Sequence, residues 1–157
     1  MREETRDSGW QPDQIGNRAG ELFDEGLYCA ESVALALTEQ SGTGTDLIPA
    51  IATGFCSGMA RTGGQCGAVS GAVMGIGLVC GRARPDEEVA PAYECVQKLL
   101  EQFRDRFGST NCYELIECDL LTDEGHQRFE QENLIEQCRQ YTVEAATMAA
   151  IILKESR

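Results

Sequence analysis

Eight cysteines are the residues of this sequence that could do chemistry, and three of them stand in the glycine-rich segment 56–81. In that segment, Cys56 and Cys66 flank a short loop that contains Arg61. A thiolate is both a nucleophile and a soft metal ligand, and a nearby positive charge favours the thiolate form. The segment therefore predicts a redox-active or metal-binding site built on Cys56 and Cys66, with Arg61 beside the two thiols.

The spacing of the cysteines argues against the sites that short motifs build. No two of them form a C-x-x-C pair; they are Cys29, Cys56, Cys66, Cys80, Cys95, Cys112, Cys118 and Cys138. Zinc ribbons, ferredoxin-type clusters and thioredoxin-like pairs all use such short spacings. A shared site would therefore have to gather cysteines from distant parts of the chain.

Apolar periodicity predicts that helices carry these cysteines. Apolar residues recur every three or four positions over most of the chain, and no convincing alternating strand is found. The expected helices are 14–40 with a bend or division at Gly26, 45–59, 66–80, 86–107, a short helix from Asn111, another from Thr122, and 134–154. We predict an all-α fold: a single-domain helical bundle of about five to seven helices over residues 14–157, after a flexible N-terminal arm over residues 1–13.

The expected helices sort the cysteines into two groups. Cys66 and Cys112 lie at predicted helix N-termini, where unpaired N–H groups and the helix dipole favour thiolate over thiol. Cys29 and Cys138 fall in the buried stripes of two helices, and Cys56 lies on the inward side of another. These five are the candidate site residues. The other three are interpreted as small apolar packing residues: Cys80, Cys95 and Cys118.

Three glycines share one face of the predicted helix 66–80. Gly67, Gly71 and Gly75 are spaced four residues apart. A glycine inside a helix costs about 1 kcal/mol relative to alanine, so close approach of another backbone is the expected compensation. That backbone could belong to a helix of the same chain or, across a symmetric interface, to a second copy in a homodimer. A third interpretation is that the glycines give a ligand access to the backbone.

The charge and the N-terminal residues limit the function classes. The formal net charge of −13 argues against binding to nucleic acid or to anionic membrane surfaces. The polar first residues do not resemble a signal peptide, so a cytoplasmic location is expected, where thiols stay reduced unless they are catalytic, redox-sensing or metal-bound. The only histidine, His126, lies in an acidic segment and is predicted to face solvent. Trp10, in the predicted arm, packs either on the domain or on a partner.

The block Cys66-Gly-Ala-Val-Ser-Gly resembles the cysteine-patterned family of redox-active proteins labelled C_GCAxxG_C_C. The remaining candidate cysteines match the layout of that family, and the resemblance extends over about residues 15–153; they are Cys29, Cys56, Cys112 and Cys138. The resemblance implies redox-active cysteines and names no substrate. A related domain occurs in split-Soret cytochromes, but this chain has no Cys-x-x-Cys-His, so covalent haem is not expected.

Three functions remain open. In the first, Cys56 and Cys66 exchange between dithiol and disulfide with a redox partner protein, and Cys29, Cys112 or Cys138 resolves the reaction. In the second, four of the five thiolates bind an iron–sulfur cluster or another metal. In the third, the chain is a structural or adaptor domain whose cysteines only pack.

Overall fold

The structure is a computed structural model that describes residues 9–44 and 46–156. It confirms the all-α prediction. The elements are α1 (Pro12–Asp24), α2 (Cys29–Ser41), the 3-10 helix η1 (Ala50–Phe55), α3 (Cys56–Arg61), α4 (Gly67–Cys80), α5 (Ala90–Phe107), α6 (Cys112–Ile116), α7 (Asp123–Gln131) and α8 (Ile135–Glu155). Within the described residues, the β-bridging is limited to one isolated pair, Gln65 with Asn111.

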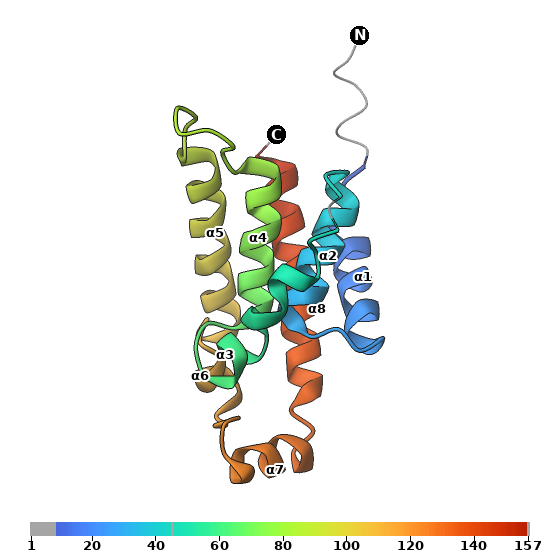
Figure 1. Ribbon diagram of the computed structural model, residues 1–157, viewed down its shortest axis with the longest axis vertical. Coiled ribbons are helices and arrows are strands. Elements are labelled where there is room, and N and C mark those ends of the chain that lie inside the picture. The colour runs from blue at the N-terminus through green and yellow to red at the C-terminus, as the bar shows by residue number, and fades with distance from the viewer. Residues whose placement is uncertain (1–8, 45, 157) are drawn as a thin grey trace.

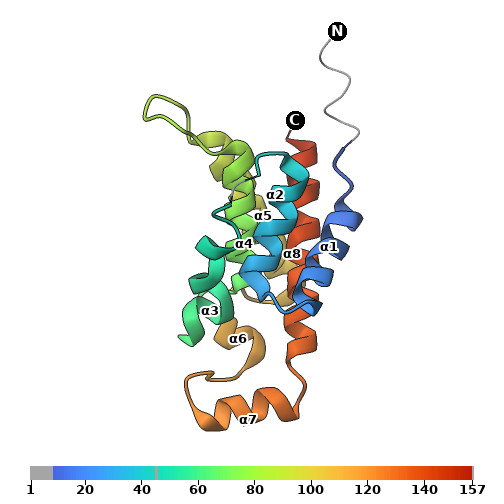
Figure 2. The ribbon, with the colours of Figure 1, turned by 45° about the vertical axis from the view of Figure 1, so that its right-hand side comes forward.

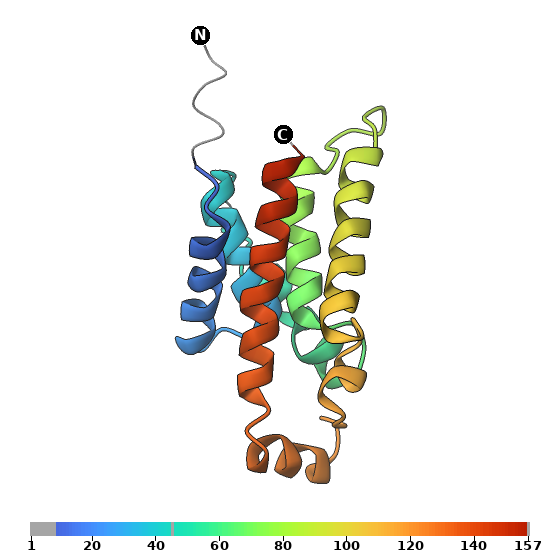
Figure 3. The same ribbon diagram turned by 180° about the vertical axis from the view of Figure 1, so that it is seen from behind.

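The long helices run side by side along the molecule. Helix α8 contacts α1, α2, α4 and α5, and Figure 3 shows it lying between the α1–α2 pair and α5. The short helices α3 and α6 gather at one end of the bundle, and α7 crosses that end (Figure 1). A view turned by 45° shows the same end from the side (Figure 2). Throughout residues 9–44 and 46–156, every helix is too short or too polar to cross a bilayer.

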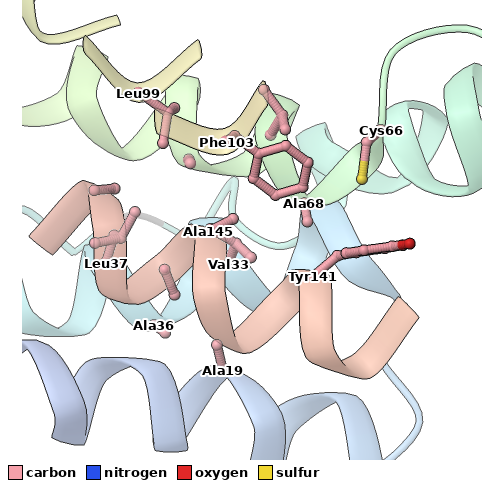
Figure 4. Close-up of a cluster of buried hydrophobic side chains, with 14 of the residues drawn as sticks. Ala19, Val33, Ala36, Leu37, Cys66, Ala68, Leu99, Phe103, Tyr141 and Ala145 are labelled. Carbon is pink, nitrogen blue, oxygen red and sulfur yellow. The ribbon is translucent and has the colours of Figure 1, made fainter. Parts of the chain in front are cut away.

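Small side chains let the helices of the core approach closely. Ala145 on α8 and Ala68 on α4 are fully buried, and Phe103 of α5 fills the space beside them. Figure 4 shows this cluster, with the Cys66 sulfur and the Tyr141 side chain at one end of it. The hydrophobic core therefore extends along the bundle to the end at which the cysteines gather.

The glycine face of α4 packs against α2 of the same chain. A Cβ added to Gly71 would lie 2.5 Å from the Ala30 carbonyl oxygen, and one added to Gly75 would overlap the Leu37 side chain. Close helix packing within the chain therefore accounts for these glycines. It also occupies the face that the homodimer interpretation assigns to a second copy.

Helix boundaries near the N-terminus differ from the sequence prediction. Gly26 adopts a φ of +117° and divides the predicted helix 14–40 into α1 and α2. Cys29 thereby becomes the first residue of a helix instead of a member of a mid-helix stripe. In the predicted flexible arm, residues 1–8 lie outside the described residues, whereas Trp10 is only 4% exposed and belongs to the core.

The predicted helix 45–59 is not formed: residues 46–49 are turns, and Ala50–Phe55 is the 3-10 helix η1. The 3-10 helix η1 is followed by a left-handed turn, in which every residue from 57 to 61 has a positive φ. Hydrogen bonds close this turn, among them Gly64 N–H to the Gly58 carbonyl oxygen at 2.9 Å. Apolar spacing cannot report the handedness of a turn, and Gly54 and Gly58 weaken a right-handed helix here. Left-handed backbone costs a residue with a Cβ about 1–2 kcal/mol.

Replacing Ala60 by glycine is expected to stabilise the protein. Ala60 is exposed with a φ of +54°, a conformation that glycine adopts without steric cost. We expect the free energy of unfolding in urea to rise by up to about 1 kcal/mol. The matched control is Ala92→Gly in the right-handed helix α5, which should lower it by a similar amount. A loss of stability in both variants would contradict the left-handed turn.

Candidate redox site

Four of the five candidate cysteines line one cavity at the end of the bundle. The cavity has a volume of about 470 Å³, and its cysteines are Cys29, Cys66, Cys112 and Cys138. The fifth candidate, Cys56, contacts Cys29 but does not itself line the cavity. The sequence-predicted set of five is therefore brought together from α2, α3, the α3–α4 loop, α6 and α8.

The three cysteines interpreted as packing residues do not line the cavity. Cys95 is buried in the core, and the Cys118 thiol donates to the Gly125 carbonyl oxygen at 2.8 Å. Cys80 is the last residue of α4, whose first residue lines the cavity. This separation is consistent with the division of the cysteines made from the sequence.

Cys29 and Cys56 form a contacting pair at the start of α2. The Cys56 thiol contacts Cys29, and it lies within hydrogen-bonding distance of Glu31 Oε1 at 3.5 Å and of the Ala52 carbonyl oxygen at 3.7 Å. Its interaction with Cys29, together with burial, raises the pKa of Cys56 far above its usual range. A Cβ on Gly67 would overlap the Cys29 sulfur, so this glycine is needed for the sulfur to fit.

Cys66 lies at the N-terminus of α4, as predicted, but its thiol is not activated there. The sulfur accepts hydrogen bonds from the N–H groups of Ala68 and Val69, which favour the thiolate. Burial has the larger and opposite effect, and it raises the pKa of Cys66 to about 11. Burial likewise raises the pKa of Cys112, the other cysteine predicted to be activated by a helix N-terminus. At both cysteines, desolvation therefore outweighs the effect of the helix N-terminus, and the thiol pKa is raised instead of lowered.

Cys138 completes a group of three buried thiols with Cys66 and Cys112. Burial, with the added repulsion of the other two sulfurs if they ionise, raises the pKa of Cys138 to about 12. The same three cysteines, after burial, raise the pKa of Tyr141, whose hydroxyl donates to the Leu115 carbonyl oxygen at 3.4 Å. At neutral pH these thiols keep their protons unless a bound cation or a reaction removes them.

The raised thiol pKa values make stability fall in alkali. A cysteine of the unfolded chain ionises near pH 8.5, so above this pH the unfolded state has lost a proton that Cys66 keeps up to about pH 11. The free energy of unfolding should then fall by up to roughly 1.4 kcal/mol per pH unit for this thiol, between those two values. Urea unfolding should show a smaller alkaline slope for Cys66→Ala than for the wild type. Equal slopes would contradict the burial of a protonated thiol.

Arg61 and His126 are among the other polar side chains on the cavity wall. Arg61, at the end of the left-handed turn, lines the cavity as a candidate site residue. His126 lines it too and is half-buried, although the sequence predicted a solvent-facing residue. Helix α7 crosses the end of the bundle, so one of its faces closes the cavity. Phe129, three residues after His126 and on the same wall, is the sequence signal that could have indicated this face.

The geometry of the cysteines does not match a site for a single metal ion. Among the described residues, no three histidine, cysteine, aspartate or glutamate side chains converge closely enough to hold one ion. The four cavity cysteines instead surround a larger space. They could contact a ligand or a cluster placed between them, or exchange disulfides with a molecule that enters.

The fold and the cavity define a small all-α protein with clustered thiols. A family model described as "Putative redox-active protein (C_GCAxxG_C_C)" matches residues 27–152, a range that contains every cysteine of the chain. The chain belongs to this family, and a general redox role is thereby supported. No curated protein matches the chain. No solved structure matches it either.

Proposed function

We propose that the chain is a thiol–disulfide redox protein in which Cys29 and Cys56 are the exchanging pair. The observation that carries this proposal is the contact between Cys29 and Cys56 at the edge of the cavity, where a Cβ added to Gly67 would lie 2.4 Å from the Cys29 sulfur and 3.1 Å from the Cys56 Cα. The pairing revises the sequence-based prediction of Cys56 with Cys66, because the Cys66 sulfur is occupied by backbone N–H groups and neighbours Cys112 and Cys138.

The exposure of the two cysteines supports an order for the proposed reaction. Cys29 is half-buried and lines the cavity, whereas Cys56 is 4% exposed behind it. The Cys29 sulfur attacks a disulfide of a partner protein, forming a mixed disulfide and releasing one partner thiol. Cys56 then attacks the Cys29 sulfur and releases the second partner thiol. Two thiols of this chain are oxidised and one partner disulfide is reduced to two thiols, with the protons conserved.

Equilibration with mixtures of reduced and oxidised glutathione tests this function. The protein should lose two free thiols in one two-electron transition, and Cys95→Ala should behave like the wild type. All eight thiols remaining reactive in the most oxidising mixture would contradict the proposal. The measurement is a thiol count in denaturant after acid quenching.

A second candidate function is binding of an iron–sulfur cluster by Cys29, Cys66, Cys112 and Cys138. The observation that favours it is that these four line one cavity, since four cysteine thiolates are the usual ligand set of such clusters. Anaerobic reconstitution with ferrous iron and sulfide should then give a coloured protein, and Cys112→Ser should lose the colour. Cys56 lies outside the cavity lining, so Cys56→Ser should keep the colour. Colourless, iron-free protein after reconstitution would rule this function out.

A further inference from the structure

The Glu31 carboxylate lies against the sulfur that must lose a proton in the proposed reaction. Glu31 Oε1 is 3.5 Å from Cys56 Sγ. The same oxygen accepts the Tyr28 backbone N–H at 3.0 Å, and Oε2 accepts the Thr53 hydroxyl at 3.0 Å. Contacts from Tyr28, the residue before α2, and from Thr53 of η1 thus hold both carboxylate oxygens in place. The carboxylate is fixed with one oxygen directed at the Cys56 thiol.

The backbone of the same residue faces the same sulfur. The Glu31 N–H hydrogen-bonds to the Cys56 sulfur, an interaction that favours the thiolate. The negative carboxylate and the Cys29 sulfur have the opposite effect and help to raise the pKa of Cys56. Cys56 therefore keeps its proton at rest and needs an acceptor within reach when it reacts.

We propose that Glu31 is the proton acceptor for Cys56 in the second step of disulfide exchange. The inference rests on the proposed function of the Cys29–Cys56 pair. As Cys56 attacks the mixed disulfide on Cys29, its proton passes to Glu31 Oε1 while its sulfur bonds to the Cys29 sulfur. The bond from Cys29 to the partner sulfur breaks with its electron pair. The released partner thiolate then receives that proton from Glu31, either directly or through a water molecule that Glu31 reprotonates, so Glu31 returns to its carboxylate form and the charge and the protons balance.

Glu31 has a structural role that must be separated from this chemical one. Through its bond to the Tyr28 N–H, it caps the first turn of α2. Glutamine can form the same cap but cannot accept the thiol proton. Glu31→Gln therefore removes the proposed chemistry and keeps the cap. Glu39→Gln is the matched control, since it makes the same change on the same helix at a side chain that pairs with Arg18 and not with Cys56.

The experiment follows the two steps separately in the full chain. Reduced protein is mixed with the aromatic disulfide dithiodipyridine, quenched with acid at successive times, alkylated and digested with trypsin. Residues 19–61 contain no internal lysine or arginine, so one peptide carries Cys29 and Cys56 and no other cysteine. Its mass distinguishes the dithiol, the mixed disulfide and the internal disulfide. The rates of the first and second steps are thus read from one sample.

Glu31→Gln should slow the second step roughly 100-fold at neutral pH, the usual contribution of a general base. The first step should stay within about threefold of the wild type, and Glu39→Gln should retain the second-step rate of the wild type. The second step of Glu31→Gln should also rise about tenfold per pH unit, because only thiolate that has already formed can react. In the wild type, this rate should depend much less on pH near neutrality.

Two outcomes would overturn the inference. One is a second-step rate in Glu31→Gln equal to that of the wild type, and the other is an equal slowing of both steps without the change in pH dependence. Failure of the proposed function itself looks different, because the wild type would then form no internal disulfide in peptide 19–61. If the Glu31→Gln variant does not fold, the pH dependence of the second-step rate in the wild type becomes the deciding measurement. A tenfold rise per pH unit in the wild type would contradict a proton acceptor.

Discussion

Replacing Cys56 by serine is expected to abolish the disulfide cycle and leave the protein trapped as a mixed disulfide at Cys29. The Cys56 thiol contacts Cys29, and a serine hydroxyl at this position cannot displace the partner sulfur. The second step should fall by more than about 100-fold, below the level that loss of a general base alone would cause. The reduced variant is exposed to oxidised glutathione, and the mass of the intact chain is then measured. The trapped glutathione adduct should appear in this mass.

The matched control for this substitution is Cys95→Ser. Cys95 is as buried as Cys56, at 4% exposure each, but it belongs to the core and does not line the cavity. Its replacement should leave the cycle intact at some cost in stability. If Cys56→Ser still loses two thiols without retaining glutathione, another pair exchanges. Cys66 with Cys112 or Cys138 would then be the next pair to test, because these three sulfurs are neighbours.

Replacing Gly71 by alanine should produce the largest loss of stability among single-methyl additions to α4. The new Cβ would meet the Ala30 carbonyl oxygen at 2.5 Å and its Cα at 3.0 Å. These are backbone atoms of the facing helix, so neither helix can yield without moving the other. We expect the free energy of unfolding to fall by at least about 2 kcal/mol, despite the higher helix propensity of alanine. Because Cys29 begins the displaced helix, disulfide formation should slow as well.

Gly77→Ala is the control for this effect. It lies on the same helix, and an added Cβ there would meet nothing within 4 Å. It should raise stability by about 1 kcal/mol through helix propensity alone. Urea unfolding of the two variants therefore gives changes of opposite sign. Two variants that are both more stable than the wild type would contradict the close packing of α2 on α4.

Much of the fold could be predicted from periodicity and capping residues. The stripe of apolar residues identified α8, and Thr122 caps α7 through its side chain, which accepts the Gly125 N–H at 2.9 Å. Asn111 caps α6 in the same way. These signals are local, since each depends on residues within a turn or two of the helix. They can therefore be recognised in the sequence without knowledge of the tertiary structure.

The contacts within the site could not be predicted in the same way. The pairing of Cys29 with Cys56 depends on the break at Gly26, which makes Cys29 the first residue of α2. The high pKa of Cys66 depends on how deeply the assembled bundle buries it, and this outweighs the local helix N-terminus. The position of His126 on the cavity wall depends on α7 crossing the end of the bundle. Sequence spacing carries no information about any of these tertiary effects.

The most direct test of the Cys29–Cys56 pair is the mass of the tryptic peptide that covers residues 19–61, measured after mild oxidation and alkylation. This peptide contains both cysteines and no other. We expect it to escape alkylation and to be lighter than the unalkylated dithiol form by two hydrogens, while the peptide with Cys66 is fully alkylated. Peptide 19–61 recovered with both cysteines alkylated, from protein that has lost thiols elsewhere, would contradict it.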